Sequence, residues 1–163
     1  RGREYFLSYL DGRRHVDELD MERLSLRKRW DKQTMESIQD LVGNTPMLAI
    51  HLRYMGQRRV VYMKCENANL SGSLKDRMAF HIIRRAYEEG RLRNGDVIAE
   101  ASSGNTGISF SALGAAMGHP VVVYMPDWMS EERKALMRSY GAQIVEISRL
   151  QGGFVGSIRK AEE

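Results

Sequence analysis

The chain has 163 residues, of which 42% are hydrophobic and 28% are charged, the composition of an ordinary globular protein. Its 25 Lys and Arg and 21 Asp and Glu are interspersed and give a net charge of +4, which argues against a nucleic-acid partner. No apolar run reaches the roughly 18 to 20 residues of a membrane helix, so we expect no membrane partner. The single cysteine, Cys65, cannot form an internal disulfide, which favours a reducing, cytoplasmic location.

Residues 1–40 differ in composition from the rest of the chain. Charged side chains dominate there, and Trp30, Met35 and Ile38 recur at intervals that are loosely consistent with a helix. We therefore predict an N-terminal helical extension over residues 1–40, made of two short amphipathic helices. A second region follows over residues 41–163.

Turn-forming and apolar residues open this second region. Gly43, Asn44 and Pro46 predict a turn before a short apolar run. The next apolar segment, residues 60–65 (VVYMKC), is rich in β-branched residues, so we predict a buried strand that contains Cys65.

An alternation of helices and strands is predicted from Lys75 onward. The expected helices cover residues 75–89, residues 106–117, a segment from the N-cap Ser130 to Gly141, and the end of the chain; the expected strands cover residues 97–101, 121–125 and 143–147. Strands joined through helices by short connections predict an α/β fold with a parallel sheet flanked by helices. Such sheets bind ligands in the loops that follow the strands, here after Ala101 and Met125.

A first glycine-bearing loop, residues 69–77 (NLSGSLKDR), places Lys75 in the first turn of a predicted helix. The positive end of the helix dipole disfavours a charged amine at that point, which eases the use of Lys75 as a nucleophile. The alternative interpretation is an ordinary solvated lysine.

A second loop, residues 102–107 (SSGNTG), lies between a predicted strand and a predicted helix. Three hydroxyls, an amide and the N–H groups of a helix N-terminus suit a carboxylate or a phosphate. The loop lacks the lysine of a P-loop and the spacing G-x-G-x-x-G, which makes an aliphatic carboxylate the better ligand. Helix capping alone would explain Ser103 or Thr106 but not six such residues together.

Four motifs together resemble one enzyme family. LVGNTP (41–46), SGSLKDR (71–77), SSGNTG (102–107) and MPDWMSEERK (125–134) occur in the order and with the spacing of the pyridoxal-phosphate-dependent cysteine synthases and their cystathionine β-synthase relatives. The resemblance extends from about Leu41 to Glu163. It implies part of a tryptophan-synthase-β-like fold, with pyridoxal 5′-phosphate as cofactor and an amino acid as substrate.

The resemblance also assigns roles to individual residues. It identifies Lys75 as the lysine that forms the Schiff base with the cofactor and later removes the substrate Cα proton. Asn105 corresponds to the asparagine that hydrogen-bonds the 3′ oxygen of the cofactor. The substrate α-carboxylate is implied to bind the loop formed by Ser102, Ser103, Gly104, Asn105 and Thr106. Ser102 departs from the usual threonine of cysteine synthases.

Neighbouring residues have supporting roles in the same resemblance. Asp76 and Arg77 are expected to hold the loop before the helix by capping and ion pairing. Trp128 follows a predicted strand and is expected to contact a lid or a subunit. The four histidines have no metal-ligand spacing, so no metal site is expected.

The expected reaction is β-replacement on an O-activated serine with sulfide as nucleophile, which makes cysteine. The alternatives are a cystathionine β-synthase-like enzyme, a diaminopropionate-type synthase, or a degenerate non-catalytic partner domain. In the family, the loop that holds the cofactor phosphate comes from the C-terminal half, and no such loop follows Gln143. We therefore expect residues 41–163 to be the N-terminal part of a catalytic domain that is inactive alone and dimeric when complete.

Overall fold

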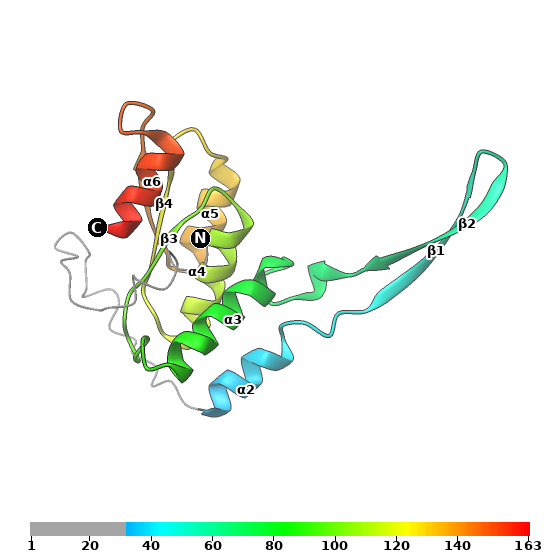
Figure 1. Cartoon of the computed structure of the whole chain (residues 1–163), viewed down its shortest axis with the longest axis horizontal. Coiled ribbons are helices and arrows are strands. Elements are labelled where there is room, and N and C mark those ends of the chain that lie inside the picture. Colours follow the sequence, from blue (N-terminus) through cyan, green and yellow to red (C-terminus); the bar gives the residue numbers. More distant parts are fainter. Residues whose placement is uncertain (1–31) are drawn as a thin grey trace.

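A computed structural model of the chain describes residues 32–163, and the fold concerns that part. Its elements in chain order are α2 (Lys32–Asp40), β1 (Met47–Tyr54), β2 (Gln57–Lys64), the 3₁₀ turn η1 (Glu66–Ala68), α3 (Lys75–Glu88), β3 (Ile98–Ala101), α4 (Asn105–Met117), β4 (Val121–Pro126), α5 (Glu131–Ser139), β5 (Gln143–Ile147) and α6 (Gly153–Glu162). Strands β1 and β2 form a hairpin arm that projects from an α/β body built of the remaining elements (Figure 1).

The α/β body contains a parallel sheet in the order β3-β4-β5. Ile98 pairs with Val121 at the start of β3, and Pro126 pairs with Ile147 at the end of β4. Helix α6 covers one face of this sheet, and α4 and α5 cover the other (Figure 1). The predicted α/β fold with a parallel sheet flanked by helices is thus confirmed.

Helix α4 packs more closely than any ordinary side chain would allow. A Cβ on Gly107 would lie 3.2 Å from Cγ1 of Val123, and a Cβ on Gly114 would clash with Cγ2 of Val121. These two glycines therefore bring α4 directly against β4. The helix is apolar on almost every side because α3 packs against its other face and completes the core.

Helix α2 is the described part of the predicted N-terminal extension. Met35 and Ile38 lie on one face of it, and both are buried in the core of the body. The other helix predicted within residues 1–40 lies outside the described residues.

The hairpin arm contradicts one prediction. Its strands pair antiparallel from Met47 with Lys64 to Tyr54 with Gln57, and every residue of both strands is exposed. The prediction of a buried strand over residues 60–65 is therefore wrong, and Cys65 lies after β2 in a half-buried position. An apolar run favours a strand, but only the packing around the strand determines its burial.

The other predicted elements agree with the structure to within about two residues at each end. Helix 75–89 corresponds to α3, helix 106–117 to α4, and strands 97–101, 121–125 and 143–147 to β3, β4 and β5. Ser130 stands at the N-cap of α5 as predicted, but its side chain makes no capping hydrogen bond. Within residues 32–163, no helix is long and apolar enough to cross a membrane.

Candidate active site

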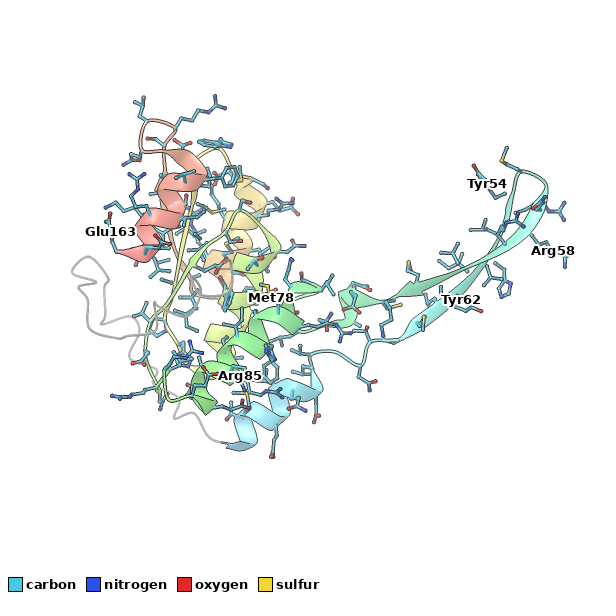
Figure 2. The ribbon with its side chains drawn as sticks, in the orientation of Figure 1. Tyr54, Arg58, Tyr62, Met78, Arg85 and Glu163 are labelled. Carbon is cyan, nitrogen blue, oxygen red and sulfur yellow. The ribbon has the colours of Figure 1, made fainter. Side chains whose placement is uncertain are left out.

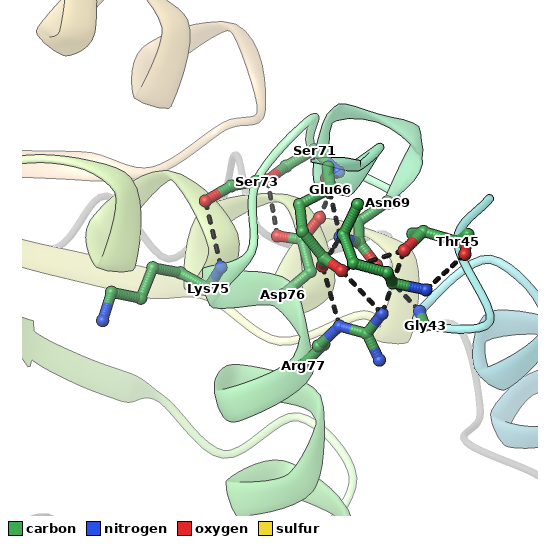
Figure 3. A network of polar contacts seen from close by, with 10 residues as sticks. Gly43, Thr45, Glu66, Asn69, Ser71, Ser73, Lys75, Asp76 and Arg77 are labelled. Atoms are coloured by element: carbon green, nitrogen blue, oxygen red, sulfur yellow. Dashed lines mark hydrogen bonds and ion pairs between the residues drawn. The ribbon is translucent and has the colours of Figure 1, made fainter. Parts of the chain in front are cut away.

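Lys75 is the first residue of α3, where its side chain is exposed. Its backbone N–H donates to Oγ of Ser73 at 3.1 Å, which fixes the start of the helix. Its side chain extends away from the neighbouring polar network (Figure 3). Within residues 32–163 its amine has no hydrogen-bond or ion-pair partner, so it is accessible to an incoming carbonyl group.

Asp76 anchors the loop before Lys75. Its buried carboxylate accepts the backbone N–H of Ser71 at 2.6 Å and the hydroxyl of the same serine at 2.5 Å. Charge-assisted hydrogen bonds of this kind are stronger than neutral ones. The expectation that Asp76 caps the loop is confirmed.

Arg77 anchors the other side of the same helical turn. Its guanidinium makes a two-pronged ion pair with Glu66, with Nε to Oε2 at 2.8 Å and Nη2 to Oε1 at 2.9 Å. These bonds, with a further one from Asn69, lower the pKa of Glu66 to about 2. The expected ion pairing of Arg77 is confirmed, and its partner is Glu66, which no local pattern in the sequence indicates.

The same network reaches back to the LVGNTP motif (Figure 3). Thr45 Oγ1 donates to Glu66 at 2.9 Å, and the N–H of Gly43 donates to Oδ1 of Asn69 at 2.8 Å. Gly43 has a φ of 88°, and a Cβ there would lie 2.9 Å from Nη1 of Arg77. The motif thus supports the first turn of α3 and holds Lys75 on a rigid base.

The loop 102–107 forms the N-terminal end of α4. Oγ of Ser102 accepts the N–H of Gly107 at 2.9 Å and that of Gly104 at 3.3 Å. This serine caps the helix, while its own hydroxyl hydrogen stays available for donation.

Three further N–H groups of this loop are unpaired. Those of Ser103, Asn105 and Thr106 have no acceptor within residues 32–163, and the side chain of Asn105 is exposed. Unpaired N–H groups at a helix N-terminus favour an anion, which fits the predicted carboxylate site.

Packing of α3 on α4 brings the two loops into one region. Oγ of Ser71, just before α3, lies 3.4 Å from Oγ of Ser109 in the second turn of α4. The N-terminal ends of both helices are thus neighbours, with Lys75 on one and residues 102–107 on the other. The structure therefore places the loop that precedes Lys75 beside α4, the helix that begins in the loop 102–107.

Glu100 is a buried carboxyl that sequence reasoning missed. It lies in β3, two residues before Ser102, and is 2% exposed. Its Oε2 has no hydrogen-bond partner within the described residues, and burial raises the pKa of this carboxyl to about 8. The signal in the sequence was a single charged residue inside an otherwise apolar strand.

Other candidate residues lie elsewhere. Trp128, in the loop after β4, packs edge to face on Phe154 with ring centroids 6.0 Å apart and stacks under Arg149. Its expected contact with a lid or a subunit is untested. No group of three His, Cys, Asp or Glu side chains in residues 32–163 could hold a metal ion.

Pyridoxal phosphate needs an accessible amine and a donor to its ring, and two residues of this region fit those needs. Lys75 offers an unpaired, exposed amine, and Asn105 offers an exposed amide on the neighbouring helix. A cofactor of this kind supplies the electron sink of the reaction, and the protein supplies binding, orientation and the groups that move protons.

Comparisons with known proteins agree with this fit. Residues 38–163 match the sequence profile of the family described as "Pyridoxal-phosphate dependent enzyme". Cysteine synthase B of Escherichia coli is 39% identical over 118 residues, which cover 72% of this chain and 39% of that protein.

Solved structures are similar as well. A hydrogen sulfide-producing enzyme of Fusobacterium nucleatum is 54% identical, with a TM-score of 0.77 over 81% of this chain and 40% of that one. An O-ureido-L-serine synthase is 37% identical, with a TM-score of 0.66 over 77% of this chain and 40% of that one. The chain spans about 40% of the length of these relatives. It belongs to the pyridoxal-phosphate-dependent enzyme family, and the relatives to which it is similar include cysteine synthases.

Proposed function

We propose that the whole protein catalyses β-replacement on an O-activated serine and makes cysteine. The observation that carries this proposal is the arrangement of Lys75 and the loop 102–107 at the N-terminal ends of two packed helices. When bound, pyridoxal phosphate supplies the electron sink that allows a β-substituent of an amino acid to leave.

The residues of this chain have separate tasks in the proposal. The Nζ of Lys75 binds the cofactor covalently and then accepts the substrate Cα proton, for which its unpaired state suits it. The free N–H groups of Ser103, Asn105 and Thr106 bind the substrate carboxylate, and the hydroxyl of Ser102 donates to it.

Substitution of Lys75 tests the proposal directly. In the whole protein, Lys75→Ala should lower the rate of cysteine formation by at least about a thousandfold, because both covalent binding and proton transfer are lost. It should also abolish the absorption band of the lysine-bound cofactor. The matched control, Lys160→Ala, removes an exposed lysine in α6 and should keep both. A band that survives Lys75→Ala would show that another lysine binds the cofactor.

A second candidate function is favoured by the 54% identity to a hydrogen sulfide-producing enzyme. Here the thiol of cysteine would be the β-substituent that leaves as hydrogen sulfide, and another nucleophile would take its place. Assays with O-acetylserine plus sulfide, and separately with cysteine plus serine, homocysteine or an amine nucleophile, distinguish the two.

Homocysteine as the best nucleophile would indicate a cystathionine-forming enzyme, and an amine would indicate a diaminopropionate-type synthase. No turnover in any assay would favour the non-catalytic partner domain.

The state of the whole protein belongs to the same proposal. We propose a cytoplasmic homodimer, on the basis of the single cysteine and the family resemblance. We also propose that residues 41–163 alone are inactive, because no loop able to hold the cofactor phosphate is recognised among them.

A further inference from the structure

Arg133 lies over the loop 102–107 although it comes from a different helix. It is the third residue of α5, and its Nη1 donates a long hydrogen bond of 3.5 Å to the carbonyl oxygen of Ser103. A Cβ on Gly104 would lie 3.4 Å from Nη1 and 3.7 Å from Cζ of this arginine. The parallel pairing of β3 with β4 explains the contact, because it places the loops after both strands at one edge of the sheet.

The peptide group between Ser103 and Gly104 is held at both ends. Its carbonyl accepts from Arg133, and its N–H donates to Oγ of Ser102 at 3.3 Å. Because a peptide group is planar, fixing its oxygen and its N–H fixes the orientation of the whole unit. Arg133 and Ser102 thus set the direction in which the loop presents its free N–H groups.

The charge of Arg133 is placed where it does not help folding. It lies in the first turn of α5 and beside the N-terminal end of α4, and a cation is unfavourable at both positions. Within residues 32–163 it makes no ion pair, whereas its neighbour Glu131 pairs with Lys134 and Arg138. An anion bound at the loop would relieve this repulsion.

We propose that Arg133 is a positioning residue for the loop 102–107. It orients the loop through the Ser103–Gly104 peptide, and it places beside the loop a positive charge that attracts an anionic substrate. The inference rests on the proposed function, in which this loop receives the carboxylate of an amino acid. It adds a residue from α5 to a site otherwise built from α3 and α4.

The test compares Arg133→Met, Arg133→Lys and the control Arg138→Met in the whole protein. Arg133→Met should raise KM for the amino-acid substrate about tenfold and leave kcat within about twofold, because it weakens binding rather than chemistry. It should also speed hydrogen exchange about tenfold at the amides of Gly104 and Gly107, which donate to Oγ of Ser102. Arg133→Lys keeps the charge without the flat guanidinium and should fall between Arg133→Met and the wild type. Arg138→Met removes one charge from the same helix, away from the loop, and should change neither value.

Two outcomes would overturn the inference. One is that Arg133→Met and Arg138→Met have the same KM and the same loop exchange, and the other is a loss of kcat with an unchanged KM. A wild-type protein that makes no product would instead contradict the proposed function. In that case the exchange rates alone still decide whether Arg133 positions the loop.

Discussion

The same four residues, Val-Val-Tyr-Met, occur in both parts of the molecule. In β4 they are residues 122–125 and lie in the sheet of the α/β body, and in β2 they are residues 60–63 and lie in the hairpin arm. The second valine is fully buried in β4, as Val123, and 48% exposed in β2, as Val61. Figure 2 shows the side chains of the arm standing free, with Tyr62 among them.

This contrast shows that a local sequence can specify a strand without specifying its burial. Helices cover both faces of β4, and strands pair with both of its edges. The partner of β2 is β1 alone, and no helix within residues 32–163 covers either face of the hairpin arm. Burial is therefore a property of the elements around the strand, and the two valines provide a direct measure of it.

The largest effect is expected from truncating the paired valines. Val123→Ala should lower the free energy of unfolding by about 2 to 3 kcal/mol, because it leaves a cavity in a filled core. Val61→Ala removes the same methyl groups from an exposed site and should cost less than about 0.5 kcal/mol. Urea denaturation of both variants measures the difference. Equal losses would mean that the hairpin arm is covered in the whole protein.

The sequence predicted the body better than the arm, for a physical reason. In β4 and α4 the apolar pattern, the turns and the flanking glycines all indicate one structure, so local and tertiary preferences agree. In residues 60–65 the β-branched and apolar side chains favour a buried strand, but only the strand agrees with the structure, because burial depends on distant elements. The turn at Met55 and Gly56, which creates the hairpin, carries a weak signal because Met stands where Asn or Asp is usual.

The candidate site was predictable to the extent that it lies in continuous motifs. Lys75 and Asn105 each lie within a continuous motif, so the family resemblance that those motifs carry implies their roles. The Glu66–Arg77 pair and Arg133 depend on contacts between distant segments, which no local pattern records. The sequence holds one indication of a role for Arg133, because an arginine in the first turn of a helix lies at the positive end of the helix dipole, where a cation is unfavourable.

A second, smaller effect is the pH dependence of stability, which arises in the α/β body because a carboxyl is buried there, whereas the side chains of the hairpin arm are exposed. Burial raises the pKa of the Glu100 carboxyl to about 8 in the folded protein, whereas its pKa in the unfolded chain is about 4.5. The folded state therefore binds more protons across this range, and its stability falls as the pH rises from about 4.5 to 8.

Glu100→Gln removes this dependence. We expect it to raise the free energy of unfolding by about 2 kcal/mol at pH 8 and to change it little at pH 4, because glutamine carries no charge that burial penalises. Urea denaturation across this pH range tests the expectation. The control Glu132→Gln removes an exposed carboxylate from α5 and should not reproduce the gain at pH 8. A variant less stable than the wild type at pH 8 would show that the charged form of Glu100 has a partner in the whole protein.

The smallest effect is expected in the turn of the hairpin arm. Met55 and Gly56 have φ angles of 49° and 77°, the positive values of a two-residue type I′ turn. Met55 is 84% exposed, so replacing it costs no packing. Met55→Asn should stabilise the turn by about 0.5 to 1 kcal/mol, seen as slower hydrogen exchange across β1 and β2, because Asn tolerates this conformation.

Gly56→Ala is the opposite control: its Cβ would meet no atom within 4 Å, so any faster exchange measures backbone strain alone. If neither substitution changes the exchange, contacts with another part of the protein hold the arm, and the turn does not limit its stability.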